Sequence, residues 1–341
     1  MMHLMTCNRP KSLLTMLGIC LALSFASGCG SSGENNLLKS GPVPTAVTEA
    51  ETVNLADFPK ADGTSLVDIT KAASGQGDFA QANAELLPGM NRVAFGVVKD
   101  GVPLYGPSVV YIAKSPRSPA QGPFPAPADP LVPQAPYLSK GAALDTAQLK
   151  AIYEAQVPLP AVGKWWVVTM TKSAGTLVQT TYSLPVVAKS KIPNVGQRPP
   201  TIQTWTNAQA AKGLPVDTRD PKAPTLHERS FANVVGMQPV ALLFSSPQFC
   251  QSRVCGPVTD LLLQLQQKYS GSLIAIQQEA YGTKPPAPSK PMVDFGLVSP
   301  NGAFTEPWLF AVGRDGLIKA RLEGAFGINA MNAALKAAIK P

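Results

Sequence analysis

The chain has 341 residues, of which 45% are hydrophobic and only 15% are charged. This composition supplies material for a folded core and argues against global disorder, and the length suggests about two domains. The formal net charge is +8, but the basic residues are scattered and form no run interleaved with aromatic residues. We therefore expect no nucleic-acid partner.

Residues 1–28 are typical of an export signal. Arg9 and Lys11 precede the apolar stretch 13–26, which is too short for a comfortable membrane span. The following Ala-Ser-Gly-Cys29 resembles a bacterial lipobox, although many lipoboxes carry leucine in place of this alanine. The resemblance implies cleavage before Cys29, a lipid on its sulfur, and a protein anchored in the cell membrane on its extracytoplasmic face. The alternative is an ordinary secretory cleavage that leaves Cys29 a free thiol.

Residues 29–55 are expected to form a flexible tether, because the segment just after Cys29 is small and polar. Residues 114–137 contain eight prolines and few large apolar side chains, so we expect a long loop there and no core element. The strand pattern at 164–170 contains two adjacent tryptophans, Trp165 and Trp166, and we expect Trp166 to lie in the core. Strand patterns occur at 92–98, 108–113, 150–157, 164–170 and 177–187.

Several short strands within about 100 residues predict a β-sandwich. Their order, with Gly-Met-Asn-Arg-Val-Ala-Phe early and Gly-Lys-Trp-Trp-Val-Val late, resembles small immunoglobulin-like domains of bacterial envelope proteins. Some of those domains occur beside copper-handling machinery. The resemblance covers 85–188 and carries no functional residues. We expect an all-β immunoglobulin-like sandwich at 56–188, acting as a spacer or a protein-contact domain, and a linker at 189–214.

The C-terminal part has a different pattern. A buried-strand pattern at 240–244 is followed by apolar residues at helical spacing over 257–269. A further strand is expected at 272–276, a hairpin with an Asp-Gly turn at 307–322, and a last amphipathic helix at 329–339. Strand, helix, strand, hairpin and helix together predict an α/β layer with a mixed sheet.

This order resembles the thioredoxin-like superfamily, and the resemblance covers about 215–340. Cys250 falls where the family's attacking cysteine follows a strand, and Pro307 falls where the family has a cis-proline that faces the disulfide. The glycines Gly316 and Gly324 match those in and after the final hairpin. The pattern is similar to a thioredoxin-domain lipoprotein with a Phe-Cys-Gln-x-x-x-Cys-Gly-Pro turn. The resemblance implies an α/β thioredoxin-like domain at 215–341 that needs no cofactor.

Two features depart from this family. Its usual motif is Cys-x-x-Cys, whereas Cys250 and Cys255 are separated by four residues. In a regular helix their Cα atoms would be about 8 Å apart, beyond disulfide reach, so a bridge requires Cys250 in a loop. Pro257 is then either a first-turn residue of the helix or a kink in a helix begun at Cys250. The second departure is Glu306, because an acid near the sulfurs raises thiol pKa values.

The cysteine pair has two interpretations. In the first, the protein is a thiol–disulfide oxidoreductase in which Cys250 attacks, Cys255 resolves the mixed disulfide and Pro307 presents the partner's backbone. Its partners would be exported thiol-containing proteins and an unidentified redox protein. In the second, the disulfide is a staple worth about 2 kcal/mol by chain entropy, in a non-catalytic binding or scaffold lipoprotein.

Metal chemistry has little support in the sequence. His227 is the only histidine after the export signal, so no zinc site of several imidazoles can be built, and we expect His227 to be a packing or surface residue. Copper-delivery relatives of the thioredoxin fold use Cys-x-x-x-Cys and a distant downstream histidine, which this chain lacks. A copper-handling envelope protein is therefore the weakest alternative. We expect no metal site and no cofactor.

Overall fold

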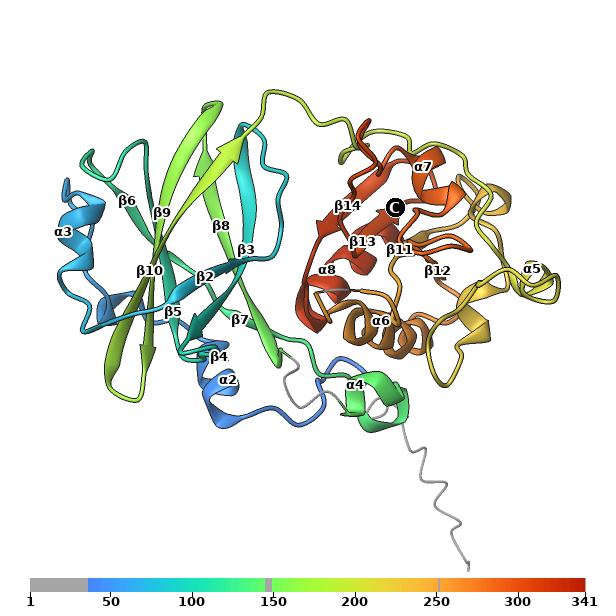
Figure 1. Cartoon of the computed structure of the whole chain (residues 1–341), viewed down its shortest axis with the longest axis horizontal. Coiled ribbons are helices and arrows are strands. Elements are labelled where there is room, and N and C mark those ends of the chain that lie inside the picture. The colour runs from blue at the N-terminus through green and yellow to red at the C-terminus, as the bar shows by residue number, and fades with distance from the viewer. Residues whose placement is uncertain (1–35, 145–148, 251, 341) are drawn as a thin grey trace, which may run out of the picture.

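The computed structural model describes residues 36–144, 149–250 and 252–340, so the expected export signal and the expected lipid-bearing Cys29 lie outside the described residues. Three β-sheets dominate the molecule, two in its first half and one in its second (Figure 1). None of the helices within these ranges is long and apolar enough to cross a membrane.

The strands follow the expected chain order, with additional short ones. They are β1 Gly75–Gln76, β2 Asp78–Gln81, β3 Gly89–Lys99, β4 Val102–Pro103, β5 Ser108–Ala113, β6 Gln121–Pro125, β7 Ala128–Pro130, β8 Ala151–Leu159, β9 Gly163–Ser173, β10 Thr176–Val186, β11 Val240–Phe244, β12 Ile274–Gln278, β13 Trp308–Val312 and β14 Ile318–Glu323. The α-helices are α2 Thr45–Ala50, α3 Leu66–Thr70, α4 Lys140–Leu144, α5 Asn207–Ala210, α6 Cys255–Lys268, α7 Lys290–Phe295 and α8 Ile328–Ile339. Short 3₁₀ turns occur at η1 Leu55–Asp57, η2 Ala135–Tyr137, η3 Pro224–His227 and η4 Phe231–Asn233.

The first half contains two sheets that pack face to face. One has the strand order β1-β10-β9-β5-β6, and the other has the order β2-β3-β8-β7 with β4 paired to β3. Their shared core includes Phe95 and Tyr153 from the second sheet and Val167 and Leu184 from the first. Side chains alternate between the two faces of a strand, which is why the period-2 patterns predicted these elements. The expected strands of this half are confirmed.

Strand β9 buries Trp165 in the core, whereas the expectation was that Trp166 would lie there. Trp165 is buried between the two sheets and donates its indole N–H to the backbone oxygen of Ala161 at 2.7 Å. Trp166 is half-buried on the outer face of β9, where it contacts a smaller cluster that includes Leu66 of α3. Both faces of β9 are apolar, so alternation alone could not decide which tryptophan points inward.

The proline-rich stretch 114–137 is not only a loop. It contributes β6 and β7, and residues such as Ala128 and Leu131 are fully or almost fully buried. Prolines are accepted there because both strands lie at sheet edges, where a missing backbone N–H breaks no ladder. The expectation that this stretch forms no core element is therefore wrong.

The expected tether and linker also hold ordered, packed residues. Within the described part of 29–55, helix α2 buries Val47 and Ala50 against the core of the two sheets. In the expected linker, the backbone N–H of Gly196 donates to the oxygen of Ile318 at 2.8 Å, and the N–H of Ile318 donates to the oxygen of Gln197 at 2.9 Å. This segment thereby continues the hydrogen bonding of β14.

The third sheet has the strand order β12-β11-β13-β14, with β11 and β12 parallel and the other pairs antiparallel. Side chains of β11 alternate between two cores, so that Leu243 meets helices α6 and α8 on one face, whereas Phe244 meets α7 on the other. The expected strands, hairpin and two longer helices of this half are confirmed. Helix α6 begins at Cys255, which places Pro257 in its first turn.

Charged side chains join the two halves. Arg92 of β3 is paired with Glu154 of β8 at 2.5 Å and also donates to the backbone oxygens of Glu323 and Ala325, at 3.1 and 2.5 Å. These bonds connect the second sheet to the end of β14. The third sheet is therefore held against the second sheet by the hydrogen bonds of Arg92.

Candidate functional site: the Cys250–Cys255 disulfide

Cys250 and Cys255 form a disulfide at the N-terminus of α6, with their Cα atoms 5.9 Å apart. Strand β11 leads into this site, and Cys250 lies in the loop between strand and helix. Arg253 adopts a left-handed backbone conformation (φ 59°), which turns the loop back toward Cys250. This geometry confirms that the bridge forms with Cys250 outside the helix and Pro257 in the first helical turn.

The two sulfur-bearing residues differ in exposure. Cys255 is fully buried, whereas Cys250 is partly exposed, and its Sγ lies 3.2 Å from the hydroxyl oxygen of Ser252. Cys255 is the first residue of α6, where backbone N–H groups have no intrahelical acceptor. The helix dipole and these N–H groups stabilise a thiolate at that place. An approaching thiol would therefore meet Cys250, and Cys255 is the better placed to leave as a thiolate.

Glu306 approaches both sulfurs. One of its carboxylate oxygens and the Sγ atoms of Cys250 and Cys255 all lie within 4.8 Å of one another. The peptide bond between Glu306 and Pro307 is cis, and Pro307 is buried. The structure thus brings Cys250, Cys255 and the acid that the sequence flagged together, and Pro307 follows that acid through a cis peptide bond.

The carboxyl group of Glu306 is in an unfavourable environment for a charge. Both of its oxygens are buried without a hydrogen-bond partner. Burial, and to a lesser extent the charge of Glu279, raise the pKa of Glu306 to about 8. The Ser246 backbone and the Tyr281 side chain lie near enough to favour its charged form, but neither makes a hydrogen bond of normal geometry with it.

A second buried acid, Glu279, lies just after β12. Its Oε2 accepts from the hydroxyl of Ser246 at 2.6 Å, and its Oε1 accepts from the backbone N–H and the hydroxyl of Thr218, each at 2.9 Å. Burial raises the pKa of Glu279 to about 7 despite these bonds. Sequence reasoning missed Glu279, although the polar run Gln-Gln-Glu at the end of a buried strand was a usable signal.

A cleft with a volume of about 390 Å³ opens beside the disulfide loop. Ser252 and Val254 of the loop line one part of it, and Thr305 and Glu306 line another. The end of β14 and the residues after it line a third part, and the other walls come from the first half of the chain, including β2 and the residues after it. Contacts between segments so distant in sequence could not be inferred from local patterns.

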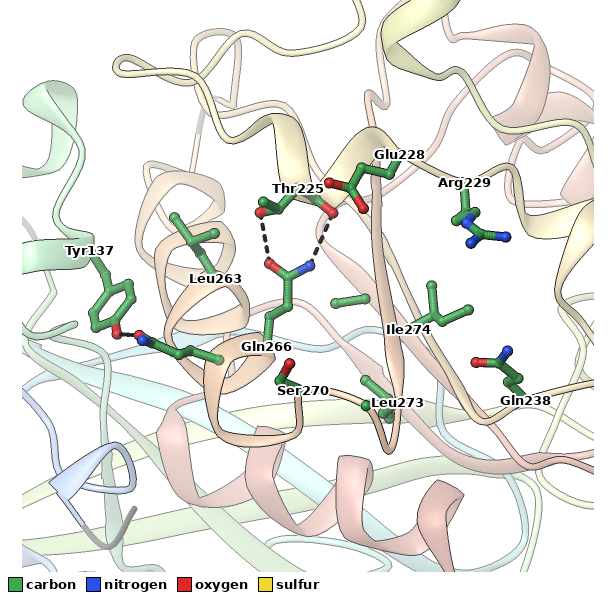
Figure 2. A pocket seen from close by; sticks show the side chains of 13 residues that line it. Tyr137, Thr225, Glu228, Arg229, Gln238, Leu263, Gln266, Ser270, Leu273 and Ile274 are labelled. Carbon is green, nitrogen blue, oxygen red and sulfur yellow. Dashed lines mark hydrogen bonds between the residues drawn. The ribbon is translucent and has the colours of Figure 1, made fainter. Parts of the chain in front are cut away.

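A larger pocket, of about 560 Å³, lies near the opposite end of α6 (Figure 2). Its residues are mostly polar, and Gln266 both accepts from the hydroxyl of Thr225, at 2.9 Å, and donates to its backbone oxygen, at 3.0 Å. Glu228 and Arg229 are its charged residues, and no cysteine or histidine lines it. Because α6 spans about 20 Å, this pocket is remote from the disulfide, and it offers neither a thiol nor an imidazole.

His227 is a packing residue. It is buried, and its Nε2 lies 3.6 Å from a carboxylate oxygen of Asp217, without a hydrogen bond. The described residues place no second histidine near it, because the only other histidine of the chain is His3. Its position agrees with the expectation of a packing or surface role.

Comparison with known proteins yields no relative: no protein-family model, no curated protein and no solved structure matches the chain. The functional argument therefore depends on the geometry of the disulfide and its surroundings.

Proposed function

We propose that this protein is an extracytoplasmic thiol–disulfide oxidoreductase of thioredoxin-like type. A partner's thiolate attacks Sγ of Cys250, the bond between Cys250 and Cys255 breaks, and its electron pair passes to Sγ of Cys255. A second partner thiolate then attacks the mixed disulfide and releases Cys250, so that the partner is oxidised and the protein is reduced. The reverse sequence reduces a partner disulfide.

The observation that carries this proposal is the asymmetry of the disulfide. Cys250 is partly exposed in a loop, and Cys255 is buried at a helix N-terminus, where its thiolate is stabilised. Attack at the more exposed sulfur, that of Cys250, makes Cys255 the leaving sulfur, and the helix N-terminus gives its thiolate backbone N–H donors. The cleft lined by Ser252, Val254 and Glu306 gives a partner's polypeptide a place to lie beside the disulfide loop.

The arrangement of the third sheet supports the thioredoxin-like assignment of 215–341. Strand β11, helix α6 and the parallel strand β12 precede the hairpin β13–β14 and helix α8, and Pro307 precedes the hairpin. The two packed sheets of the first half support an immunoglobulin-like sandwich at 56–188. In this proposal the protein is anchored by a lipid on Cys29 and acts on exported proteins.

Redox titration tests this proposal against the staple interpretation. After equilibration in defined glutathione or dithiothreitol buffers, an exchangeable pair should show a potential above about −300 mV, whereas structural disulfides commonly lie below it. The variant C255S should trap mixed disulfides through Cys250, and the matched variant C250S should trap far fewer. A potential well below about −300 mV with no trapped partner would favour a scaffold lipoprotein with a structural disulfide.

A further inference from the structure

The two sulfurs and Glu306 form a cluster of potential metal ligands. Within the described ranges, this is the only group of three or more histidine, cysteine or acidic residues whose donor atoms lie so close, with Cys250, Cys255 and Glu306 all within 4.8 Å of one another. In a tetrahedral zinc site with thiolate and carboxylate ligands, donor atoms lie about 3.5–3.8 Å apart. Once the disulfide is reduced, the two sulfurs are free to separate to that spacing, and Glu306 is already within reach.

The state of Glu306 gives an independent reason to expect a cation. Its two carboxylate oxygens are buried without hydrogen bonds, a situation that is costly unless another group satisfies them. The Sγ atoms of both cysteines lie within 4.8 Å of one of these oxygens. A bound cation would therefore supply the contacts that these carboxylate oxygens lack.

We propose that the reduced form of this protein binds one divalent cation of the zinc class through Cys250, Cys255 and Glu306. A dithiol reductant supplies two electrons and two protons to the disulfide and is itself oxidised to a disulfide. The cation then displaces the thiol protons to solvent and is bound by two thiolates and one carboxylate. A disulfide oxidant then accepts the two electrons from the thiolates, takes up two protons from solvent to become a dithiol, and the re-formed Cys250–Cys255 disulfide releases the cation.

The donor set selects the class of metal. Two thiolates exclude Mg²⁺ and Ca²⁺, which prefer oxygen ligands. Cu⁺ is satisfied by two thiolates alone and would leave Glu306 without a role, whereas Zn²⁺ readily takes mixed sulfur and oxygen ligands. With three protein ligands, the fourth position would be open toward water or toward a ligand in the cleft that Ser252 and Glu306 line.

The test is a titration of the full chain with Co²⁺, a spectroscopic substitute for Zn²⁺, after reduction with a phosphine that is then removed. The expected result is one equivalent of Co²⁺ with sulfur-to-cobalt charge-transfer absorption and the visible bands of a tetrahedral site, both lost on addition of Zn²⁺. Oxidised protein should show neither signal. The double variant C250S/C255S should also show neither, which excludes binding by Cys7, Cys20 and Cys29.

The role of Glu306 is tested with matched variants. E306Q should weaken Co²⁺ binding at least tenfold, whereas E228Q, which changes an exposed acid of the remote pocket, should bind Co²⁺ as the wild-type protein does. Circular dichroism of the oxidised variants confirms that each is folded. Absence of the cobalt spectrum in the reduced protein, equal affinity in E306Q, or binding of Cu⁺ but not of Zn²⁺ would overturn the proposal. None of these readouts depends on whether the protein exchanges disulfides with a partner.

Discussion

Asp129 caps the N-terminus of helix α8, because one of its carboxylate oxygens accepts the backbone N–H of Asn329 at 2.8 Å. Asp129 belongs to β7 in the second sheet, whereas α8 packs against the third sheet. The other carboxylate oxygen of Asp129 accepts the N–H of Ala330, also at 2.8 Å. The helix supplies no side-chain cap of its own, since its N-cap residue is Gly327. An aspartate remote in sequence therefore provides what a serine or aspartate normally provides locally.

We predict that stability falls as the pH rises through the range in which Asp129 ionises. Burial, followed by the charge of Glu154, raises the pKa of Asp129 from 3.8 to about 7 in the folded protein. Between these two pKa values the folded state therefore binds more protons than the unfolded state. The stabilisation that protonated Asp129 gives to the folded state is complete below pH 3.8 and is lost as the pH rises toward 7. In urea unfolding, the free energy of unfolding of D129N should fall less over this pH range than that of the wild-type protein.

A control for this experiment is D315N. Asp315 is exposed, and its hydrogen bond to Lys319 is the main cause that lowers its pKa, so its contribution is lost only as the pH falls. The decline toward neutral pH should therefore persist in D315N. If the free energy of unfolding falls equally with rising pH in D129N and in the wild-type protein, Asp129 is not the group responsible.

Replacing Arg92 should destabilise the protein strongly. Its guanidinium has two backbone acceptors in the second half of the chain and one carboxylate partner, Glu154, and both charged side chains are 14% exposed. R92A leaves Glu154 buried without its partner, and such losses typically cost about 3–5 kcal/mol. Denaturant unfolding measures the difference. The control K71A removes an exposed ion pair with Asp68 and should cost no more than about 1 kcal/mol.

Loss of the disulfide should have only a modest effect on stability. The bridge closes a loop over a sequence separation of five residues, for which chain entropy gives about 2 kcal/mol. The variant C250S/C255S should therefore keep its circular dichroism spectrum and unfold at a somewhat lower denaturant concentration. A loss of folded structure in this variant would instead assign the bridge a main structural role.

Lipid attachment is predicted at Cys29. Mass spectrometry of the mature N-terminus should show a diacylglycerol on this residue, and C29A should release the protein from membranes. An unmodified Cys29 in the mature protein, or C29A that stays with the membrane fraction, would contradict the lipobox interpretation.

Local patterns predicted more of the second half than of the first. The buried strand β11, helix α6 and the β13–β14 hairpin carry period and turn signals within a few residues. The sequence also predicted the bridge between the two cysteines and, through the thioredoxin-like resemblance, the cis peptide bond before Pro307. It placed the wrong tryptophan inward and missed β6 and β7, because the faces of β9 are equally apolar and prolines at a sheet edge are indistinguishable from prolines in a loop.

The surroundings of the disulfide were less accessible to sequence reasoning. Glu306 could be flagged because it precedes Pro307, but its missing hydrogen bonds and its distance to the sulfurs depend on packing. Glu279 and the wall contributed by β2 reach the site only through the arrangement of whole sheets. Such contacts join residues with no common local pattern.

The prolines of the edge strands also bear on how the protein behaves at high concentration. Strand β6 contains Pro123 and Pro125, and β7 ends at Pro130, so neither presents a continuous row of N–H groups to another chain. The opposite edges of the same sheets are β1 and β2, which have only two and four residues. Short or proline-bearing edges oppose strand-to-strand joining between molecules, so these two sheets are poor templates for aggregation.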